Sequence, residues 1–468
     1  MEKETRLFTR VMILGVGSAV SKATIFLLMP LYTRLLTPAD FGTADLLVSG
    51  ATLLLPLLTL EAPEAIFRFL AGKGEERSIV QAGLKMVGAG AVFTAVLFPF
   101  LALIPFFRPF LALLSLYVLS AAWHKVTACV LRARGEYGFF ATQQCFCTFL
   151  AALLAFLFLS TFRLSVRGYL VSILLSDAIT ALLLTVYLFK TRKGKTENVE
   201  NPLSPMLRYA LPLIPSAALW WIFGAVGRYV LLYTHGRAET GIFAAAMKIP
   251  AVLSFAAGIF MEAWQYSAVR AGKDPRALFG RIFASFASLL LLFTVFLVLF
   301  SRVLAAHLFA DGFANAAAFL PFLLIGAFCG ALSSFFISTN MVKLRSFVSL
   351  ETAGIGAAFA VLASFFLIPA QGVAGAVAAT VISEAALLVL RALIARRVLS
   401  FPQPVFRFSI SFLFLFLCAL LAAREKGGLS AVFGLTALLP FSPEYFALFH
   451  SIMQYGKNFF KIRQKNAN

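Results

Sequence analysis

Residues 285–301 read SFASLLLLFTVFLVLFS and contain no charged side chain. A second run of the same kind, FSISFLFLFLCALLAA, covers residues 408–423. A helix needs about 20 mostly apolar residues to cross a bilayer, whereas the strands of a membrane β-barrel show alternating segments of about ten. These long continuous runs therefore predict an all-α polytopic membrane protein.

The composition of the whole chain supports this fold class. Of 468 residues, 61% are hydrophobic and only 13% are charged. A soluble domain is about 45–50% apolar and about 25% charged. This difference excludes a soluble enzyme and a nucleic-acid-binding protein, and the apolar content excludes a disordered chain.

Apolar runs between charged or turn-rich breaks predict about 14 transmembrane helices. The first six cover residues 11–33, 42–67, 81–106, 109–131, 139–162 and 168–189. The next six cover residues 208–233, 240–266, 278–300, 313–338, 347–368 and 372–395. The last two cover residues 405–423 and 429–449.

The basic residues give the orientation of these helices. The chain has 40 Lys and Arg against 20 Asp and Glu, a net charge of +20. If the N-terminus is cytoplasmic, most basic residues fall in cytoplasmic segments, as the positive-inside rule requires. We therefore expect a multi-pass protein of the inner (plasma) membrane with both termini in the cytoplasm. Its basic loops would contact anionic lipids, so the charge needs no nucleic-acid partner.

The longest hydrophilic break, residues 190–205, divides two halves that look alike. Residues 31–33, LYT, recur as residues 232–234, and Glu61 recurs as Glu262. Six helices in each half give both copies the same orientation, which is a parallel repeat of the kind used by transporters. The predicted parts are an N-terminal lobe at 1–195, a C-terminal lobe at 196–400, and two further helices with a basic cytoplasmic tail at 401–468.

Basic residues inside the predicted helices are the candidates for binding an anionic headgroup. An ionisable group in the bilayer core costs about 2.5–3.5 kcal/mol on insertion scales, so it tends to face a cavity or a partner. Lys22, Arg228 and Lys248 would form a cationic central cavity. The alternative for Arg228 is to reach the interface with its long side chain. We expect His124 and Lys125 to form an interhelical pair with a glutamate or the backbone.

Acidic residues inside the helices are the candidates for ion coupling or a gate: Glu61, Glu64 and Glu262. Glu61 and Glu64 are three positions apart and would share one face of a continuous helix. They could relay a proton or another cation. They could equally form a structural latch with Arg68 or Lys85.

Other chemistry finds little support in the sequence. The five cysteines all fall inside apolar runs, where packing explains them better than a metal site. The phosphate-binding loop of nucleotide hydrolases is missing, and no segment is large enough for a soluble transferase domain. We therefore expect no cofactor, no metal and no enzymatic activity.

Residues 30–42 read PLYTRLLTPADFG. This P-x-Y-T-R-x-L-x-P-x-x-F-G run, together with the helix count, resembles the polysaccharide-export (Wzx-like) flippase branch of the multidrug/oligosaccharidyl-lipid/polysaccharide (MOP) exporter superfamily. The resemblance covers residues 6–400 well and the last two helices loosely. It implies a V-shaped transporter that moves a polyprenyl-diphosphate-linked oligosaccharide from the inner to the outer leaflet by alternating access. Lys22 and Lys248 match helices that carry cations in related flippases.

The resemblance also implies the partners: a lipid-linked oligosaccharide, H⁺ or Na⁺ as a coupling ion, and polymerase or assembly proteins. Two alternatives stay open at this point. One is a cation-coupled drug or metabolite antiporter of the same superfamily. The other is of a different class, a membrane polysaccharide polymerase or an assembly scaffold. A polymerase would be expected to have a large external loop, and all the predicted external loops are short.

Overall fold

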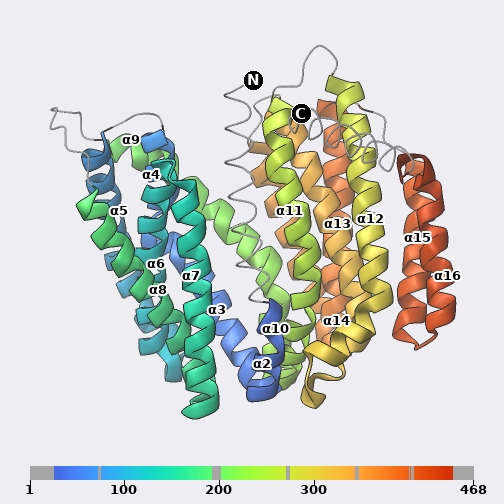
Figure 1. Cartoon of the computed structure of the whole chain (residues 1–468), viewed down its shortest axis with the longest axis horizontal. Helices are drawn as coiled ribbons and strands as arrows, with labels where there is room; N and C mark the ends of the chain where they lie inside the picture. Colours follow the sequence, from blue (N-terminus) through green and yellow to red (C-terminus); the bar gives the residue numbers. More distant parts are fainter. Residues whose placement is uncertain are drawn as a thin grey trace, which may run out of the picture. The chain divides into compact units, whose positions relative to one another are not determined.

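The computed structural model describes residues 26–71, 75–191, 202–269, 275–342, 347–399, 401 and 405–445. Every secondary-structure element within these ranges is helical (Figure 1), which confirms the all-α prediction. The earlier helices are α2 Met29–Leu35, α3 Pro38–Thr59, α4 Ala62–Ala71, α5 Glu76–Ala102, α6 Leu111–Ala133, α7 Tyr137–Phe156, α8 Ser165–Lys190, α9 Leu203–Ala210 and α10 Leu213–Ala246. The later ones are α11 Lys248–Val269, α12 Pro275–Leu308, α13 Ala316–Val342, α14 Phe347–Val398, α15 Val405–Ala423 and α16 Gly427–Leu438.

The helices have the length and composition of membrane spans. Within the described residues, ten helical segments are long and apolar enough to cross a membrane. Two of these segments, Leu203–Met261 and Leu350–Val398, each contain more than one helix. Each helix predicted after the first falls on a described helix, whereas most of the first one, 11–33, lies outside the described residues.

A glycine with non-helical backbone angles interrupts each of two long helical elements, α10 and α14. Gly236 interrupts α10 with φ 88°, and Gly372 interrupts α14 with φ 57°. Glycine reaches this left-handed half of φ space without the steric cost that a Cβ brings. Each element is therefore two helices joined at a single glycine, which leaves few peptide groups outside a helix.

The chain forms two compact units. The first contains the described residues up to Ala245 together with Leu308–Phe313 and Ala360–Ala376. The second contains Ala246–His307, Ala314–Phe359 and the described residues from Val377 onward. This division differs from the lobe boundary near residue 195 that the sequence suggests, and that boundary stays a prediction.

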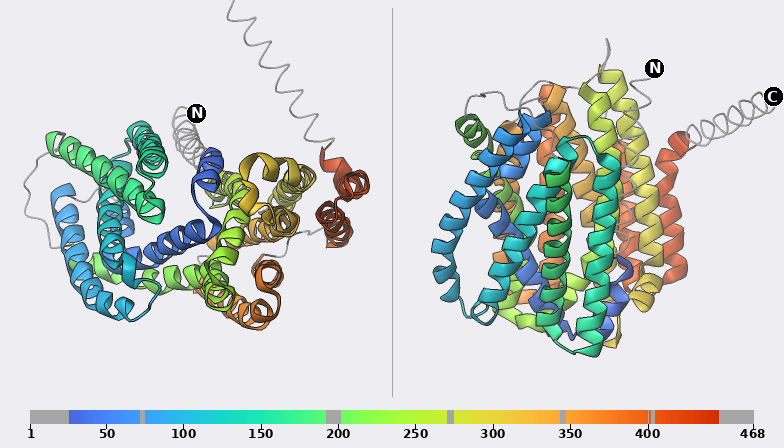
Figure 2. Two further views of the ribbon diagram at one scale, coloured as in Figure 1. Left: turned by 90° about the horizontal axis from the view of Figure 1, so that it is seen from below. Right: turned by 60° about the vertical axis from the view of Figure 1, so that its left-hand side comes forward.

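The first unit is built around α3, α6 and α8. Leu46 and Leu47 of α3 are fully buried in one cluster with Leu114 of α6 and Leu170 of α8. Figures 1 and 2 show α5, α6 and α8 running side by side in this unit. The apolar contacts of α3 fix it between its neighbours, which matters because α3 carries part of the candidate site.

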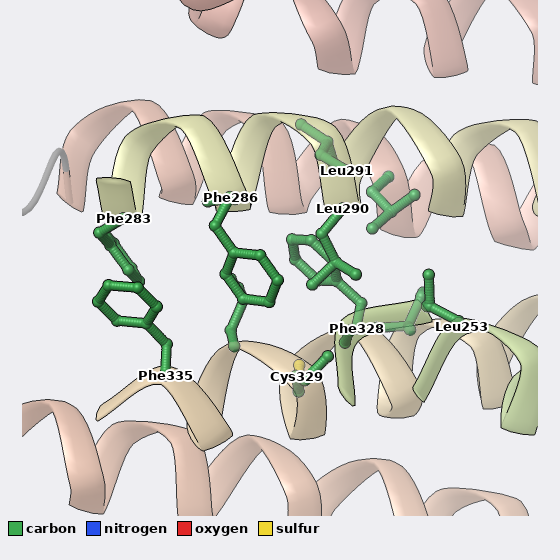
Figure 3. Packing of buried hydrophobic residues seen from close by; sticks show 14 of the residues in the cluster. Leu253, Phe283, Phe286, Leu290, Leu291, Phe328, Cys329 and Phe335 are labelled. Atoms are coloured by element: carbon green, nitrogen blue, oxygen red, sulfur yellow. The ribbon is translucent and has the colours of Figure 1, made fainter. Parts of the chain in front are cut away.

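The second unit has an aromatic core between α11, α12 and α13. In Figure 3, Phe283 and Phe286 of α12 point toward Phe335 of α13. Trp264 of α11 stacks on Phe335 with ring centroids 5.4 Å apart and an interplanar angle of 8°. The Trp264 indole also donates a hydrogen bond of 2.9 Å to the Ser338 hydroxyl. A polar indole N–H is thus satisfied inside an apolar cluster, as burial requires.

The start of α3 lies against the backbone of α10. A Cβ added to Gly241 would come within 1.8 Å of the Pro38 carbonyl oxygen, so only glycine allows this approach. We expect Gly241→Ala to destabilise the first unit by about 1–3 kcal/mol, the usual cost of overpacking. The measurement is the thermal unfolding temperature of the purified protein in detergent.

Gly224 on the same helix is the matched control, because a Cβ there would meet no atom within 4 Å. Gly224→Ala should leave the unfolding temperature unchanged or raise it slightly, since alanine favours a helix over glycine. Equal unfolding temperatures for the two variants would show that the close approach does not hold.

Candidate functional site

A buried ion pair joins α3 and α10. Arg228 Nη1 donates to Asp45 Oδ2 at 2.7 Å, and Nη2 donates to the Gly224 carbonyl at 2.9 Å. The side chain of Asp45 is 8% exposed and that of Arg228 22%. Arg228 Nε is buried and has no acceptor among the described atoms. The guanidinium is therefore held by two hydrogen bonds, and its buried Nε donor is left without a described acceptor.

Aromatic residues of α10 hold this pair in place. Trp221 Nε1 donates to the Ser49 carbonyl at 2.6 Å, and the Tyr229 hydroxyl donates to the Leu46 carbonyl at 2.9 Å. The two rings lie 5.4 Å apart. Both bonds reach backbone oxygens of α3, so α10 is fixed to α3 on either side of Arg228.

A second feature of the first unit is the break between α3 and α4. Leu60 and Glu61 have φ values of 48° and 52°, a left-handed conformation that is strained for residues with a side chain. The Glu61 side chain is 8% exposed, and its Oε2 lies 3.8 Å from Lys125 Nζ of α6. The expectation of a glutamate or backbone partner is thus confirmed for Lys125 but wrong for His124, whose ring contacts Asp177 and Gln143.

The break leaves the two predicted glutamates at the start of α4, and they differ in exposure. Glu61 is buried, whereas Glu64, in the first turn of α4, is exposed. The continuous helix assumed for residues 42–67 is therefore wrong, because the chain leaves the helical conformation at Leu60 and Glu61, while the shared face of the two glutamates stays a prediction. As a result the two carboxylates lie in different surroundings.

A third polar group joins α6, α7 and α8. The two ring nitrogens of His124 lie 2.8 Å from Asp177 Oδ1 and 2.9 Å from Gln143 Oε1, and Cys147 Sγ lies 3.4 Å from the same Asp177 oxygen. The ligand atoms of His124, Cys147 and Asp177 all lie within 4.8 Å of one another. This is the group among the described residues that has the donor types and spacing to hold a metal ion.

The second unit contains the other predicted positions. Lys248 is the first residue of α11 and is half-buried. Glu262 lies on the same helix, but its side chain is outside the described residues. Arg391 of α14 is 5% exposed and donates to the hydroxyls of Ser333 and Thr352 at 3.1 and 3.4 Å. Lys22 lies outside the described residues.

The structure thus pairs two of the predicted site residues, one of them with a residue that the sequence analysis did not name. Arg228 binds Asp45, and Glu61 faces Lys125. Sequence reasoning missed Asp45 as a functional candidate. Asp45 could have been found from the sequence, because it is a carboxylate within the apolar run that follows residue 41. An ionisable group at such a position needs a partner.

Comparison with known proteins identifies a family for the chain, and comparison with solved structures identifies its fold. A family model described as "Polysaccharide biosynthesis protein" matches residues 8–265. No curated protein sequence matches the chain.

Among solved structures, one titled "Lipid II flippase MurJ, inward closed conformation" has a TM-score of 0.70 at 14% identity, over 94% of this chain and 99% of that one. An inward-facing multidrug resistance MATE family transporter of the MOP superfamily has a TM-score of 0.62 at 16% identity, over 83% of this chain and 97% of that one. Its outward-facing counterpart gives 0.56 at 17%, over 83% and 95%. At these identities the likeness shows the fold, which is that of MOP-superfamily transporters.

The ion pair between α3 and α10 generates a stability prediction. Removing one partner of a buried pair leaves an uncompensated charge and costs about 3–5 kcal/mol. We expect Asp45→Asn and Arg228→Gln each to lower the unfolding temperature of the purified protein strongly. The double variant should lose less than the sum of the two single losses, because it leaves no charge unpaired.

Arg163→Gln is the control, since this arginine is exposed and lies in the short segment between α7 and α8. It should unfold at the wild-type temperature. Strictly additive losses in the double variant would mean that Asp45 and Arg228 do not interact.

Proposed function

Because the chain belongs to the polysaccharide biosynthesis protein family, we propose that it is a flippase for cell-surface polysaccharide biosynthesis. Its substrate is an oligosaccharide linked to a polyprenyl diphosphate. The protein moves this lipid from the inner to the outer leaflet of the inner (plasma) membrane by alternating access, with both of its own termini in the cytoplasm.

The family match is the observation that carries this proposal. It covers residues 8–265, which include α2 to α10. The fold adds support, since the lipid II flippase shares it over 94% of this chain. A lipid-linked substrate also suits a membrane protein whose predicted external loops are short.

In this proposal the diphosphate is bound by Lys22, Arg228 and Lys248. Arginine presents its donors in a planar fork that matches phosphate oxygens. The Arg228 fork has one buried donor, Nε, without a described acceptor, and an unsatisfied buried donor is costly. A phosphate oxygen would satisfy it, while Asp45 keeps the guanidinium in position from its other end.

Ion coupling is assigned to the acidic residues Glu61, Glu64 and Glu262. Glu61 sits at the break between α3 and α4, facing Lys125 at 3.8 Å. A proton on Glu61 would remove its charge and its attraction to Lys125. Such a change at a strained, non-helical junction provides a means of linking H⁺ or Na⁺ binding to movement of α4. Polymerase or assembly proteins would take the sugar after its transfer.

The binding role of the two lysines is tested by Lys22→Ala together with Lys248→Ala. Charge-assisted hydrogen bonds contribute about 1.5–3 kcal/mol each, so outward movement should fall at least about tenfold. The measurement is the access of an external lectin to lipid-linked sugar in reconstituted vesicles.

Lys190→Ala is the matched control, because Lys190 is an exposed lysine at the end of α8. It should move substrate at the wild-type rate. Unchanged flipping by the double lysine variant, at equal reconstitution, contradicts the cationic site.

A cation-coupled drug or metabolite antiporter is the second candidate. It is favoured by the fold shared with MATE transporters over 83% of this chain. Under this alternative, Glu61→Gln should abolish efflux of a cationic dye from vesicles while sugar movement stays intact. Under the flippase proposal, the same substitution should slow sugar movement and the wild type should show no dye efflux.

A further inference from the structure

The first unit contains a groove that the proposed transport chemistry does not use. It lies between α5, α6 and α8 and has a volume of about 520 Å³. Its walls are mostly apolar, and Leu84, Leu119 and Phe189 are 55%, 48% and 69% exposed. Large apolar side chains with this exposure show that the groove opens to the outside of the unit. An apolar groove does not hold ordered water well, because water needs polar partners there.

The second unit has a cavity at the place that the repeat predicted from the sequence makes equivalent. It lies between α12, α13 and the last part of α14, and its volume is about 390 Å³. In the count of predicted spans, α12, α13 and the last part of α14 are the third, fourth and sixth helices of the second half. In the first half, α5, α6 and α8 hold these same three places. Here Phe408 and Phe412 of α15 form part of the wall. Among the described residues, Leu58 of α3 is the only one from another helix that lines the first groove, and no aromatic helix covers it as α15 does in the second unit.

The first groove ends in charged residues at one end only. Arg134 donates to both carboxylate oxygens of Glu76 and to the Thr191 hydroxyl, so its charge is already compensated. Arg77 beside them is exposed, and none of the described residues forms an ion pair or hydrogen bond with it. An apolar groove with one available cation at its end fits an amphiphile with an anionic head.

The charged end is the one that the positive-inside rule places at the cytoplasmic face. Anionic lipids are concentrated in the cytoplasmic leaflet, and basic pockets between transmembrane helices on that side bind their headgroups. An apolar partner helix would fit the walls but would leave Arg77 without an acceptor, whereas a phospholipid supplies both an apolar chain and a phosphate. The charge therefore favours a lipid over a protein as the occupant.

We propose that this groove binds one acyl chain of an anionic phospholipid, with the phosphate held by Arg77. In the first unit the lipid covers the groove between α5, α6 and α8. In the second unit, aromatic side chains of α15 cover the corresponding cavity. This inference does not depend on the transported substrate.

Trp123 provides a direct test, because it lines the groove and is 41% exposed. The probe is phosphatidylglycerol with brominated acyl chains, which quench tryptophan emission on contact. It is added to the full-length protein in phosphatidylcholine vesicles, and the Trp123 signal is the difference between the wild type and Trp123→Phe. Phosphatidylglycerol should quench this signal at a lower mole fraction than equally brominated phosphatidylcholine does.

Arg77→Gln should remove this preference, with an apparent affinity about fivefold lower, as expected for one arginine near a membrane surface. Arg108→Gln is the matched control, since Arg108 is also exposed but precedes the opposite end of α6. Its preference should equal that of the wild type.

Filling the groove gives an independent measurement. Leu119→Trp should lower the number of phosphatidylglycerol molecules retained by the purified protein in native mass spectrometry. Leu182→Trp, at an exposed α8 position outside the groove, should not. Equal quenching by the two lipids in the wild type would overturn the proposal. The proposal would also be overturned if polyprenyl phosphate, added in an amount equal to that of phosphatidylglycerol, displaced the phospholipid. That result would assign the groove to a polyprenyl chain.

Discussion

In the hydrocarbon core of a bilayer, no water is present to hydrogen-bond a peptide N–H or C=O, and each unpaired group costs several kcal/mol. The rest of the structure depends on this constraint. It explains why the described elements are helical and why the turns at Gly236 and Gly372 are so short. It also makes the left-handed residues Leu60 and Glu61 exceptional, because they interrupt the hydrogen-bond ladder within a predicted span.

The same lack of water acts on charges, and the first unit meets it by pairing them between helices. Asp45 with Arg228 joins α3 to α10, and Asp177 with His124 joins α8 to α6. Such pairs are expensive to bury, so they are weak evidence for stability alone. They do fix which helix faces which neighbour. In a transporter, groups of this kind are also the ones whose charge a substrate or a coupling ion can change.

Most of the fold could be predicted from the sequence, and the site could be predicted only in part. Hydropathy predicts the helices because the bilayer imposes their length, and Lys125 was correctly expected to pair with a glutamate. The break at Leu60 and Glu61 has one sequence signal, Pro63, which has no N–H to donate to the Thr59 carbonyl and lies in the first turn of α4. The left-handed conformation itself is not signalled, since neither Leu60 nor Glu61 favours it. It is stabilised by packing, which a helical spacing rule does not contain. The Asp45–Arg228 pair was out of reach for a similar reason: it joins helices more than 180 positions apart in sequence.

The composition of the first unit also bears on the order in which the chain is made. This unit includes Leu308–Phe313 and Ala360–Ala376. Thr33 near its start donates to the Leu308 carbonyl at 2.9 Å, and Phe41 contacts Phe313 edge to face. A ribosome releases the chain from the N-terminus, so the helices that emerge first wait for these later segments. The first unit therefore cannot reach its final packing during its own synthesis, and its early helices must persist in the membrane as an incomplete bundle until most of the chain has been inserted.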